Sequence, residues 1–218
     1  MLAGSQQYDC NCLDTDGSYN TYLLNLLISR EYQNPISYYR GDQYFNTWAP
    51  GYLNLANGAT VTNISLRYNK FLDEVLWLRT SDFKTGIINK SIVSGFAIFD
   101  QDNHLLGSFV KRRIKTPGLD SVYAYLQVLA EGELSLYAYR NVVKAISESR
   151  TVDNTTYYIF VNEDQYYTIR LKKKSLLRIP VIDSEIMKSI IRTNRIVFRK
   201  NETNFAMALK LYNEALTR

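Results

Sequence analysis

The sequence predicts an α+β protein that is mainly β: a curved antiparallel meander or open barrel, with a short N-terminal helix and with C-terminal helices packed on the sheet. Three observations predict this class. Apolar and polar side chains alternate with a period of two over most of residues 51–171, which is the spacing of strands. Short turns join most of these segments and leave no room for crossover helices, so the strands they join must run antiparallel. Beyond residue 171 the apolar spacing becomes that of amphipathic helices.

The chain length favours one domain. A chain of 218 residues with 46% hydrophobic and 22% charged residues can bury one sizeable core and has the composition of a globular protein. Residues 1–17 are polar and contain Gly and Asp, so we expect a loose N-terminal arm there. We expect a single globular domain over residues 18–218, with the sheet at about 51–171 and the helical end at about 175–218.

Residues 18–34 predict a short amphipathic helix. Ser18 is a suitable N-cap, apolar side chains then recur at helical spacing, and Asn34-Pro35 ends the pattern. The next segment, residues 38–51, is aromatic and bounded by Gly and Pro, which favours an ordered loop pinned by its rings. The candidate residues for an aromatic recognition surface in this loop are Tyr39, Tyr44 and Trp48.

Residues 51–69 predict the first hairpin. Apolar and polar residues alternate on both sides of Asn57-Gly58. Asn-Gly between such runs favours a type I′ turn, because both residues accept the positive φ that this turn requires. Further strands are predicted at residues 74–79, 87–89, 95–99, 105–114, 122–130, 133–140, 157–161 and 166–171.

Two amphipathic helices are predicted at the end of the chain. One follows Asp183-Ser184 and the other follows Asn201. Each carries its apolar side chains in one stripe, which must be buried, so we expect both helices to pack on the sheet. The first stripe contains Ile186, Met187, Ile190 and Ile191, and the second contains Phe205, Ala208, Leu209, Tyr212 and Leu216.

Tyrosine is the strongest compositional bias, with 18 residues against 3 Met and 1 His. Tyr suits strands with a wet face, because its ring packs while its hydroxyl reaches water. A tyrosine-rich surface also suits recognition of sugars, peptides or bases, but strands alone account for the bias. The net charge of +5 permits contact with an anionic surface.

Basic residues gather in two runs, at 111–115 and 170–174. If the runs converge in space, they could bind lipid head groups, acidic polysaccharide or nucleic acid. Alternation along a strand sends Lys111 and Arg113 to one face and Arg112 to the other, so solvated strand ends are the competing interpretation. The candidate anion-binding residues are Lys111, Arg113, Lys115, Lys172, Lys173 and Lys174.

The sequence offers no recognisable catalytic, cofactor-binding or metal-ligating set. The single histidine, His104, has no serine or cysteine in a nucleophile motif near it. Cys10 and Cys12 are the only cysteines, and two thiolates need further ligands to hold a metal. Carboxylate pairs leave a hydrolase as an alternative, although each pair lies in a turn or in the arm. These pairs are Asp14 with Asp16, Asp100 with Asp102, and Glu163 with Asp164.

Several short motifs resemble those of a group of uncharacterised, exported bacterial proteins, in which a glycine-led strand and a turn precede a Leu-Arg-Tyr-Asn strand. The resemblance covers roughly residues 38–216. It implies the β-then-helix layout and export, and it brings no activity and no site residues. The motifs are Gly51-Tyr52-Leu53-Asn54-Leu55, Asn57-Gly58, Leu66-Arg67-Tyr68-Asn69, Asp73-Glu74-Val75, Tyr157-Tyr158-Ile159 before Tyr166, the basic link Lys172-Lys173-Lys174-Ser175-Leu176-Leu177, and Tyr212-Asn213 in the final helix.

The first residues also favour export. Leu2-Ala3-Gly4-Ser5 is similar to the small residues around a signal-peptide cleavage site, although the segment is too short to be a signal peptide itself. No stretch approaches the ~18 apolar residues that a membrane-spanning helix needs. We therefore expect a periplasmic or cell-surface location, with the signal peptide absent from this chain. A cytoplasmic location is the alternative.

These observations together favour a non-catalytic binding or structural protein of the bacterial cell envelope. Its expected partner is an envelope protein, a polysaccharide or a lipid head group, and no cofactor is expected. One alternative is a cytosolic domain whose basic strand ends bind nucleic acid. The other is a hydrolase that uses the turn carboxylates.

Overall fold

The computed structural model describes residues 7–9, 27–32, 47–79, 83–116, 119–144, 151–162, 164–198 and 201–217. The chain divides into two compact units. The N-terminal unit comprises Met1–Lys111 and Asn141–Asn154, and the C-terminal unit comprises Arg112–Arg140 and Thr155–Arg218. Strand β8 (Leu105–Thr116) passes from the first unit into the second. That the units fold as a single domain stays a prediction from the sequence.

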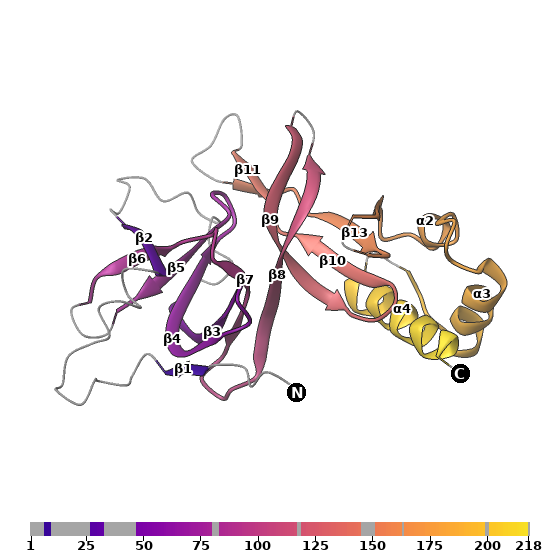
Figure 1. Ribbon diagram of the computed structural model, residues 1–218. Helices are drawn as coiled ribbons and strands as arrows, with labels where there is room; N and C mark the ends of the chain where they lie inside the picture. Colours follow the sequence, from indigo (N-terminus) through magenta and orange to yellow (C-terminus); the bar gives the residue numbers. More distant parts are fainter. Residues whose placement is uncertain are drawn as a thin grey trace. The chain divides into compact units, whose positions relative to one another are not determined.

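The predicted fold class is confirmed, since the described strands form an open, mostly antiparallel meander that is followed by helices (Figure 1). In the N-terminal unit the strand order is β2-β6-β5-β4-β3-β7-β8, and β1 adds to β4 in parallel. A separate small sheet pairs β11 with β12. The bounds are β1 Gln7–Asp9, β2 Ile28–Glu31, β3 Ala49–Leu55, β4 Thr60–Asn69, β5 Glu74–Leu78, β6 Thr85–Ile88, β7 Val93–Phe99, β11 Val142–Lys144 and β12 Thr151–Asp153.

The hairpin predicted at Asn57-Gly58 is confirmed, but its turn is not type I′. The Gly58 N–H donates to the Leu55 carbonyl at 3.0 Å, and Gly58 has a φ of 86°. Asn57 does not have a positive φ. Its Oδ1 instead accepts a hydrogen bond from the Ala59 N–H at 3.0 Å, which holds the turn in another way. The loop therefore needs the left-handed conformation at glycine alone, as in three-residue hairpin loops that end in a bulge.

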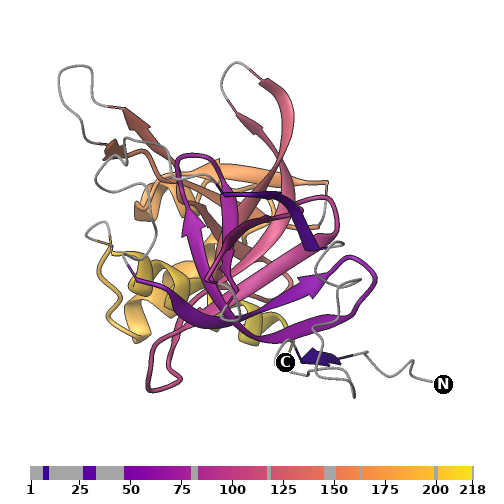
Figure 2. The ribbon, with the colours of Figure 1, turned by 90° about the vertical axis from the view of Figure 1, so that its left-hand side faces the viewer.

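Curvature of this sheet has a local cause. The register between β3 and β4 shifts between Gly51 and Leu53, and a bulge of this kind bends a strand and increases its twist. The purple strands of residues 49–69 curve strongly in Figure 2. Three rings fill the concave interior: Tyr68, Phe96 and Phe109 are all at most 1% exposed, with centroid separations of 4.6–5.4 Å. The Tyr68 side chain thus packs inside the sheet.

The N-terminal helix predicted over residues 18–34 lies mostly outside the described residues, and within them it is wrong from Ile28 onward. Leu27 has helical geometry and is fully buried, but Ile28–Glu31 form strand β2. β2 pairs antiparallel with β6, so a long-range ladder overrides the local helical spacing. In the segment expected to be a loose arm, Gln7–Asp9 form β1. The other residues of that arm lie outside the described part of the chain.

The C-terminal unit contains a smaller antiparallel sheet in the order β8-β9-β10-β13-β14. Short connections join β9 to β10 and β13 to β14, as the sequence predicts. One hydrophobic cluster holds this sheet and the helices together, and Figure 1 shows α4 lying along β10. The bounds are β9 Leu119–Ala130, β10 Ser135–Tyr139, β13 Thr156–Phe160, β14 Tyr166–Ile169, α2 Lys173–Leu176, α3 Ser184–Thr193 and α4 Glu202–Leu216.

Both predicted C-terminal helices form, and a polar side chain caps the start of each. Asp183 accepts from two backbone N–H groups at the start of α3, and Asn201 accepts from the Asn204 N–H at the start of α4. The α4 stripe is buried except at its end, where Leu216 is 39% exposed. Ile186 in the α3 stripe is also exposed, at 37%.

Asn213 replaces Leu216 as the last anchor of α4. Its Oδ1 accepts from the Leu134 N–H at 3.1 Å, and its Nδ2 donates to the Leu134 carbonyl at 2.9 Å. The side chain therefore bonds Leu134 as a neighbouring strand would, at the turn between β9 and β10. Gly132 lies so close that a Cβ there would be 2.2 Å from Asn213 Nδ2. On the preceding residue, the Tyr212 hydroxyl accepts from the Asp183 N–H at 2.8 Å, which ties α4 to α3.

Candidate functional site

The most distinctive site in the described chain is a cavity of about 550 Å³ beside strand β14 in the C-terminal unit. Residues from β14 form one wall, and residues from α2 and the turn after it form the other. We call this cavity the basic groove. It is lined by Tyr167, Thr168, Ile169, Arg170, Lys172, Lys174, Ser175, Arg178 and Ile179.

Buried apolar residues fix the walls of the basic groove. Ile169 on β14 and Ile179 after α2 are 6% and 5% exposed and belong to the hydrophobic cluster of the unit. The Ser175 hydroxyl accepts from the Arg170 N–H at 3.1 Å, so the α2 turn is bonded to the end of β14. Leu176, which is fully buried, anchors α2 in the same hydrophobic cluster. The polar residues between these anchors are left at the surface.

Four cationic side chains surround the basic groove, and all four are exposed: Arg170, Lys172, Lys174 and Arg178. Within the described part of the chain, none of these four side chains forms an ion pair or hydrogen bond. The local sequence explains this, since residues 165–182 contain five cationic residues and no acidic one. Cations around one cavity make its electrostatic potential positive, and a bound anion would reduce the repulsion between them.

The structure brings two of the six candidate anion-binding residues to this groove, Lys172 and Lys174. Lys173 is exposed but does not line the groove. Arg113 donates from Nε to the Ser121 hydroxyl at 2.6 Å, and Lys115 is exposed. Arg178 was missed in the sequence, although it lies four residues after Lys174 in the same acid-free stretch.

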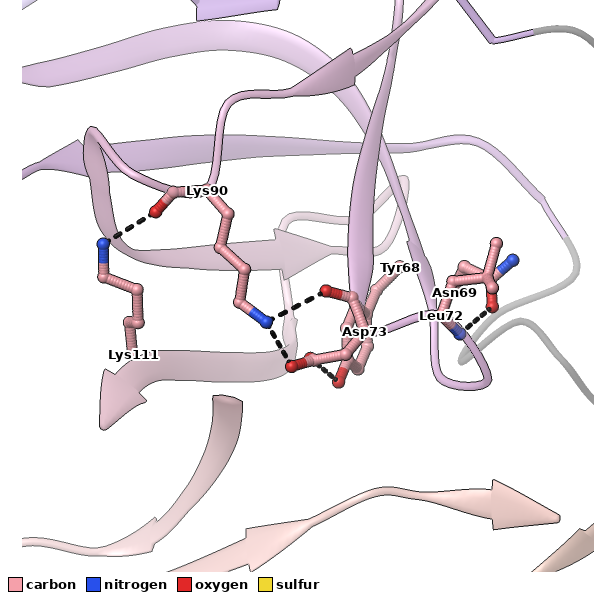
Figure 3. Close-up of polar contacts among 6 residues, drawn as sticks. All are labelled: Tyr68, Asn69, Leu72, Asp73, Lys90 and Lys111. Carbon is pink, nitrogen blue, oxygen red and sulfur yellow. Dashed lines mark hydrogen bonds and ion pairs between the residues drawn. The ribbon is translucent and has the colours of Figure 1, made fainter. Parts of the chain in front are cut away.

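The remaining candidate, Lys111, is engaged with the backbone. Its Nζ donates to the Lys90 carbonyl at 2.7 Å (Figure 3). It also donates to the Ser91 carbonyl at 3.1 Å. Burial, together with the neighbouring Lys90 ammonium, lowers the pKa of Lys111. Lys111 therefore supports the turn before β7.

A polar cluster beside Lys111 is also structural. The Tyr68 hydroxyl donates to Asp73 Oδ1 at 2.7 Å, and Lys90 Nζ donates to Asp73 Oδ2 at 2.5 Å (Figure 3). Asp73 is only 8% exposed, so its charge needs these partners. Asn69 Oδ1 accepts from the N–H groups of Phe71 and Leu72, which closes the turn between β4 and β5.

A second cavity, of about 370 Å³, lies in the N-terminal unit and includes the predicted recognition residue Trp48. The Arg67 guanidinium lies 5.4 Å from the centre of the Trp48 ring. Phe83 is 79% exposed and has a φ of 54°, which is unusual for an aromatic residue. Glu31 in the same wall accepts from Lys84. The other two predicted recognition residues, Tyr39 and Tyr44, lie outside the described residues.

A half-buried network in the C-terminal unit fixes the start of α4. Arg140 donates to both oxygens of Glu202 at 2.7 Å and to Gln127 at 2.6 Å, and the Tyr157 hydroxyl also bonds Glu202. The hydrogen bonds from Arg140 lower the pKa of Glu202, against the effect of its burial. Burial raises the pKa of Tyr157 to about 12, with a further contribution from Glu202. The network stabilises the fold.

Two carboxylates lie close to the single histidine of the sequence in the turn between β7 and β8. One ligand atom each of Asp100, Asp102 and His104 lie within 4.8 Å of one another. The Asp100 oxygens already accept from two backbone N–H groups and from the His104 ring, and the bond from the His104 N–H is the main cause that lowers the pKa of Asp100. The cluster therefore has the bonding of a turn. The cysteines, the Asp14–Asp16 pair and Glu163 lie outside the described residues.

Comparison with known proteins adds no assignment, because no family model, curated protein or solved structure matches this chain. Among the described residues, no helix has both the length and the apolar character to cross a membrane.

Proposed function

We propose that this protein is a non-catalytic binding protein of the bacterial cell envelope, and that it binds a ligand bearing carboxylate or phosphate groups in the basic groove. The observation that supports this most is the meeting of four cations around one cavity of about 550 Å³, with no acidic residue in its lining. Cavities of this size are typical of ligand sites. Arginine and lysine together offer planar and point-charge recognition of oxyanions.

The hydroxyl groups of the groove support the same chemistry. Thr168 and Tyr167 lie in its wall beside Arg170, so they can add directional hydrogen bonds to the charge attraction. The buried floor of Ile169 and Ile179 gives the cavity a fixed shape. A ligand with both an apolar part and anionic groups would therefore match it better than a small free ion.

The location in the envelope rests on the resemblance to exported bacterial proteins. An envelope protein, an acidic polysaccharide and a lipid head group all carry the required anionic groups. Fractionation of cells that express the complete reading frame tests the location. Recovery of the protein from the cytoplasmic fraction would contradict it.

The binding proposal is tested by titrating the protein with inorganic tripolyphosphate. Reversing two groove charges with Lys174→Glu and Arg178→Glu should weaken binding at least tenfold, because both cations line the cavity. The matched control is Arg192→Glu with Lys210→Glu, two exposed residues outside the groove that change the net charge equally. We expect the control to weaken binding less than threefold at ~0.15 M salt, where distant charges are screened. Equal losses in both variants would contradict a localised site.

A further inference from the structure

Strand β14 ends the strand order of the C-terminal sheet, so one of its edges faces no described strand. The bonding pattern identifies the groups on that edge. At the turn, the Val161 N–H donates to the Gln165 carbonyl at 2.9 Å. Bonded and non-bonded pairs alternate along an antiparallel ladder, so Tyr167 and Ile169 bond to β13. The N–H and carbonyl of Tyr166 and Thr168 therefore point away from the sheet.

The neighbouring residue Arg170 supports this assignment. By the same alternation its N–H and carbonyl also point outward, and both are occupied by local partners. The N–H donates to the Ser175 hydroxyl at 3.1 Å, and the carbonyl accepts from the Lys172 N–H at 2.7 Å. In the part of the chain that the structure describes, the outward N–H and carbonyl of Thr168 have no such partner.

The basic groove runs along this open edge. Its lining includes four successive residues of the β14 segment, from Tyr167 to Arg170. Successive side chains of a strand point to opposite faces, so a cavity that touches all four must border the edge of the strand. At about 3.3 Å per residue, these four residues extend over roughly 13 Å. An extended peptide of three or four residues has that length.

The charge around the edge selects among extended peptides. Lysine and arginine on an edge strand normally prevent unwanted pairing, because a second neutral or basic strand is not attracted. An acidic strand is attracted by the same charges. The four cations of the groove line the same cavity as Thr168. They would therefore neutralise the carboxylates of a strand placed beside Thr168.

We propose that an extended acidic segment of a partner protein adds as a strand beside β14, bonding the outward backbone groups of Thr168 and pairing its carboxylates with the cations of the basic groove. This inference rests on the proposed anion-binding function and names the partner class for that same site. Backbone bonds supply the affinity in such strand addition, and the flanking side chains supply the specificity.

The test uses a fluorescein-labelled nine-residue peptide of alternating Glu and Thr. Its first control is the same peptide N-methylated at alternate positions, which keeps the charges and removes backbone donors. We expect the methylated peptide to bind at least tenfold more weakly to the full-length protein. Equal binding of the two peptides would overturn strand addition while leaving anion binding intact. Absence of binding by both the peptide and tripolyphosphate would overturn both proposals.

A protein variant separates the backbone from the charges. Thr168→Pro removes one outward N–H at a position where an edge strand tolerates proline, and it leaves the four cations in place. The control is Thr168→Val, which loses the same hydroxyl but keeps the N–H. We expect Thr168→Pro to bind the peptide at least tenfold more weakly than Thr168→Val does, and to bind tripolyphosphate within twofold of Thr168→Val. If the variant does not fold, hydrogen exchange on the natural protein decides: peptide should slow exchange of the Thr168 N–H at least tenfold. Unchanged exchange would overturn the proposal, as would tighter binding of single-stranded DNA or heparin than of the peptide.

Discussion

The two units differ in what their cationic side chains do. Among the described residues of the N-terminal unit, the lysine and arginine pairs with carboxylates are Arg30–Glu74, Lys70–Asp153, Arg79–Glu31, Lys84–Glu31 and Lys90–Asp73. In the C-terminal unit, Arg140 pairs with Glu202 and Lys188 with Glu185, yet the four cations of the basic groove have no carboxylate within 4 Å among the described residues. The positive charge that makes up the net +5 is therefore not available equally on the two units. A cation with a partner supports the fold, and a group of cations without one is available to a ligand.

The largest expected effect comes from removing α4, which tests how far the two units can be treated separately. Deletion from Asn201 onward removes the buried side chains of Phe205, Leu209 and Tyr212, each worth roughly 1.5–3 kcal/mol. We expect loss of cooperative unfolding or insoluble protein. Both tryptophans, Trp48 and Trp77, belong to the N-terminal unit, so their fluorescence reports on that unit alone. A truncated protein that retains the parent fluorescence melt would show that the N-terminal unit is independent, contrary to the predicted single domain.

A smaller loss is expected from Asn213→Ala in the C-terminal unit. The substitution leaves the N–H and carbonyl of Leu134 without their side-chain partner in a buried position. At about 1–3 kcal/mol for each of these two unsatisfied groups, we expect a loss of roughly 2–6 kcal/mol in the free energy of unfolding. Urea unfolding followed by circular dichroism measures it. The control is Asn204→Ala on the exposed side of the same helix, which removes one exposed hydrogen bond to the Val197 carbonyl. We expect this control to lower the free energy of unfolding by less than about 1 kcal/mol. Similar losses would contradict the anchoring role of Asn213.

The contrast between paired and unpaired cations is tested most directly with two matched substitutions. Lys90→Met removes the ammonium from the nearly buried Asp73 carboxylate and should lower the free energy of unfolding by about 1–3 kcal/mol. Lys174→Met in the groove should change it by less than about 0.5 kcal/mol, because no described side chain depends on that charge. Chemical unfolding of both variants gives the comparison. A destabilised Lys174→Met protein would show that the groove cations support the fold.

The smallest expected effect is a pH dependence that belongs to the C-terminal unit. The folded protein lowers the pKa of Glu202 below the usual value of 4.5. The Glu202 carboxylate therefore stabilises the folded state fully above pH 4.5, and this stabilisation is lost as the pH falls through the lowered pKa. Glu202→Gln should remove this part of the acid sensitivity. Stability curves between pH 3 and pH 7 for both proteins should differ most at the neutral end. Parallel curves would contradict a role for the Glu202 charge.

The sequence predicted much of the sheet because period-two alternation and turn residues act locally. The predicted strand at residues 95–99 and the hairpin at Asn57-Gly58 were recovered for that reason. The strand at Ile28–Glu31 was missed, because its pairing with β6 is formed 55 or more residues away and leaves no local signal. The turn type was also wrong, since the Asn57 side chain closes the turn without a positive φ.

The basic groove could be predicted only in part. The run from Lys172 to Lys174 marks the segment, but a run of charges does not say which of its members face one cavity. The short helix α2 turns Lys173 away from the lining and brings Arg178 into it. Lys111 has the same residue type and an equally basic neighbourhood in the sequence, yet its ammonium bonds two backbone carbonyls. Only the folded backbone distinguishes these cases.

The bond between Asn213 and Leu134 also sets an order of events during synthesis. The two residues are 79 positions apart, so a ribosome that adds about 5–20 residues per second reaches Asn213 roughly 4–16 s after Leu134. Throughout that interval the turn between β9 and β10 lacks its side-chain partner, and the apolar surface that α4 later covers is exposed. We therefore expect the nascent C-terminal unit to present apolar surface to chaperones until the last turns of α4 leave the ribosomal tunnel.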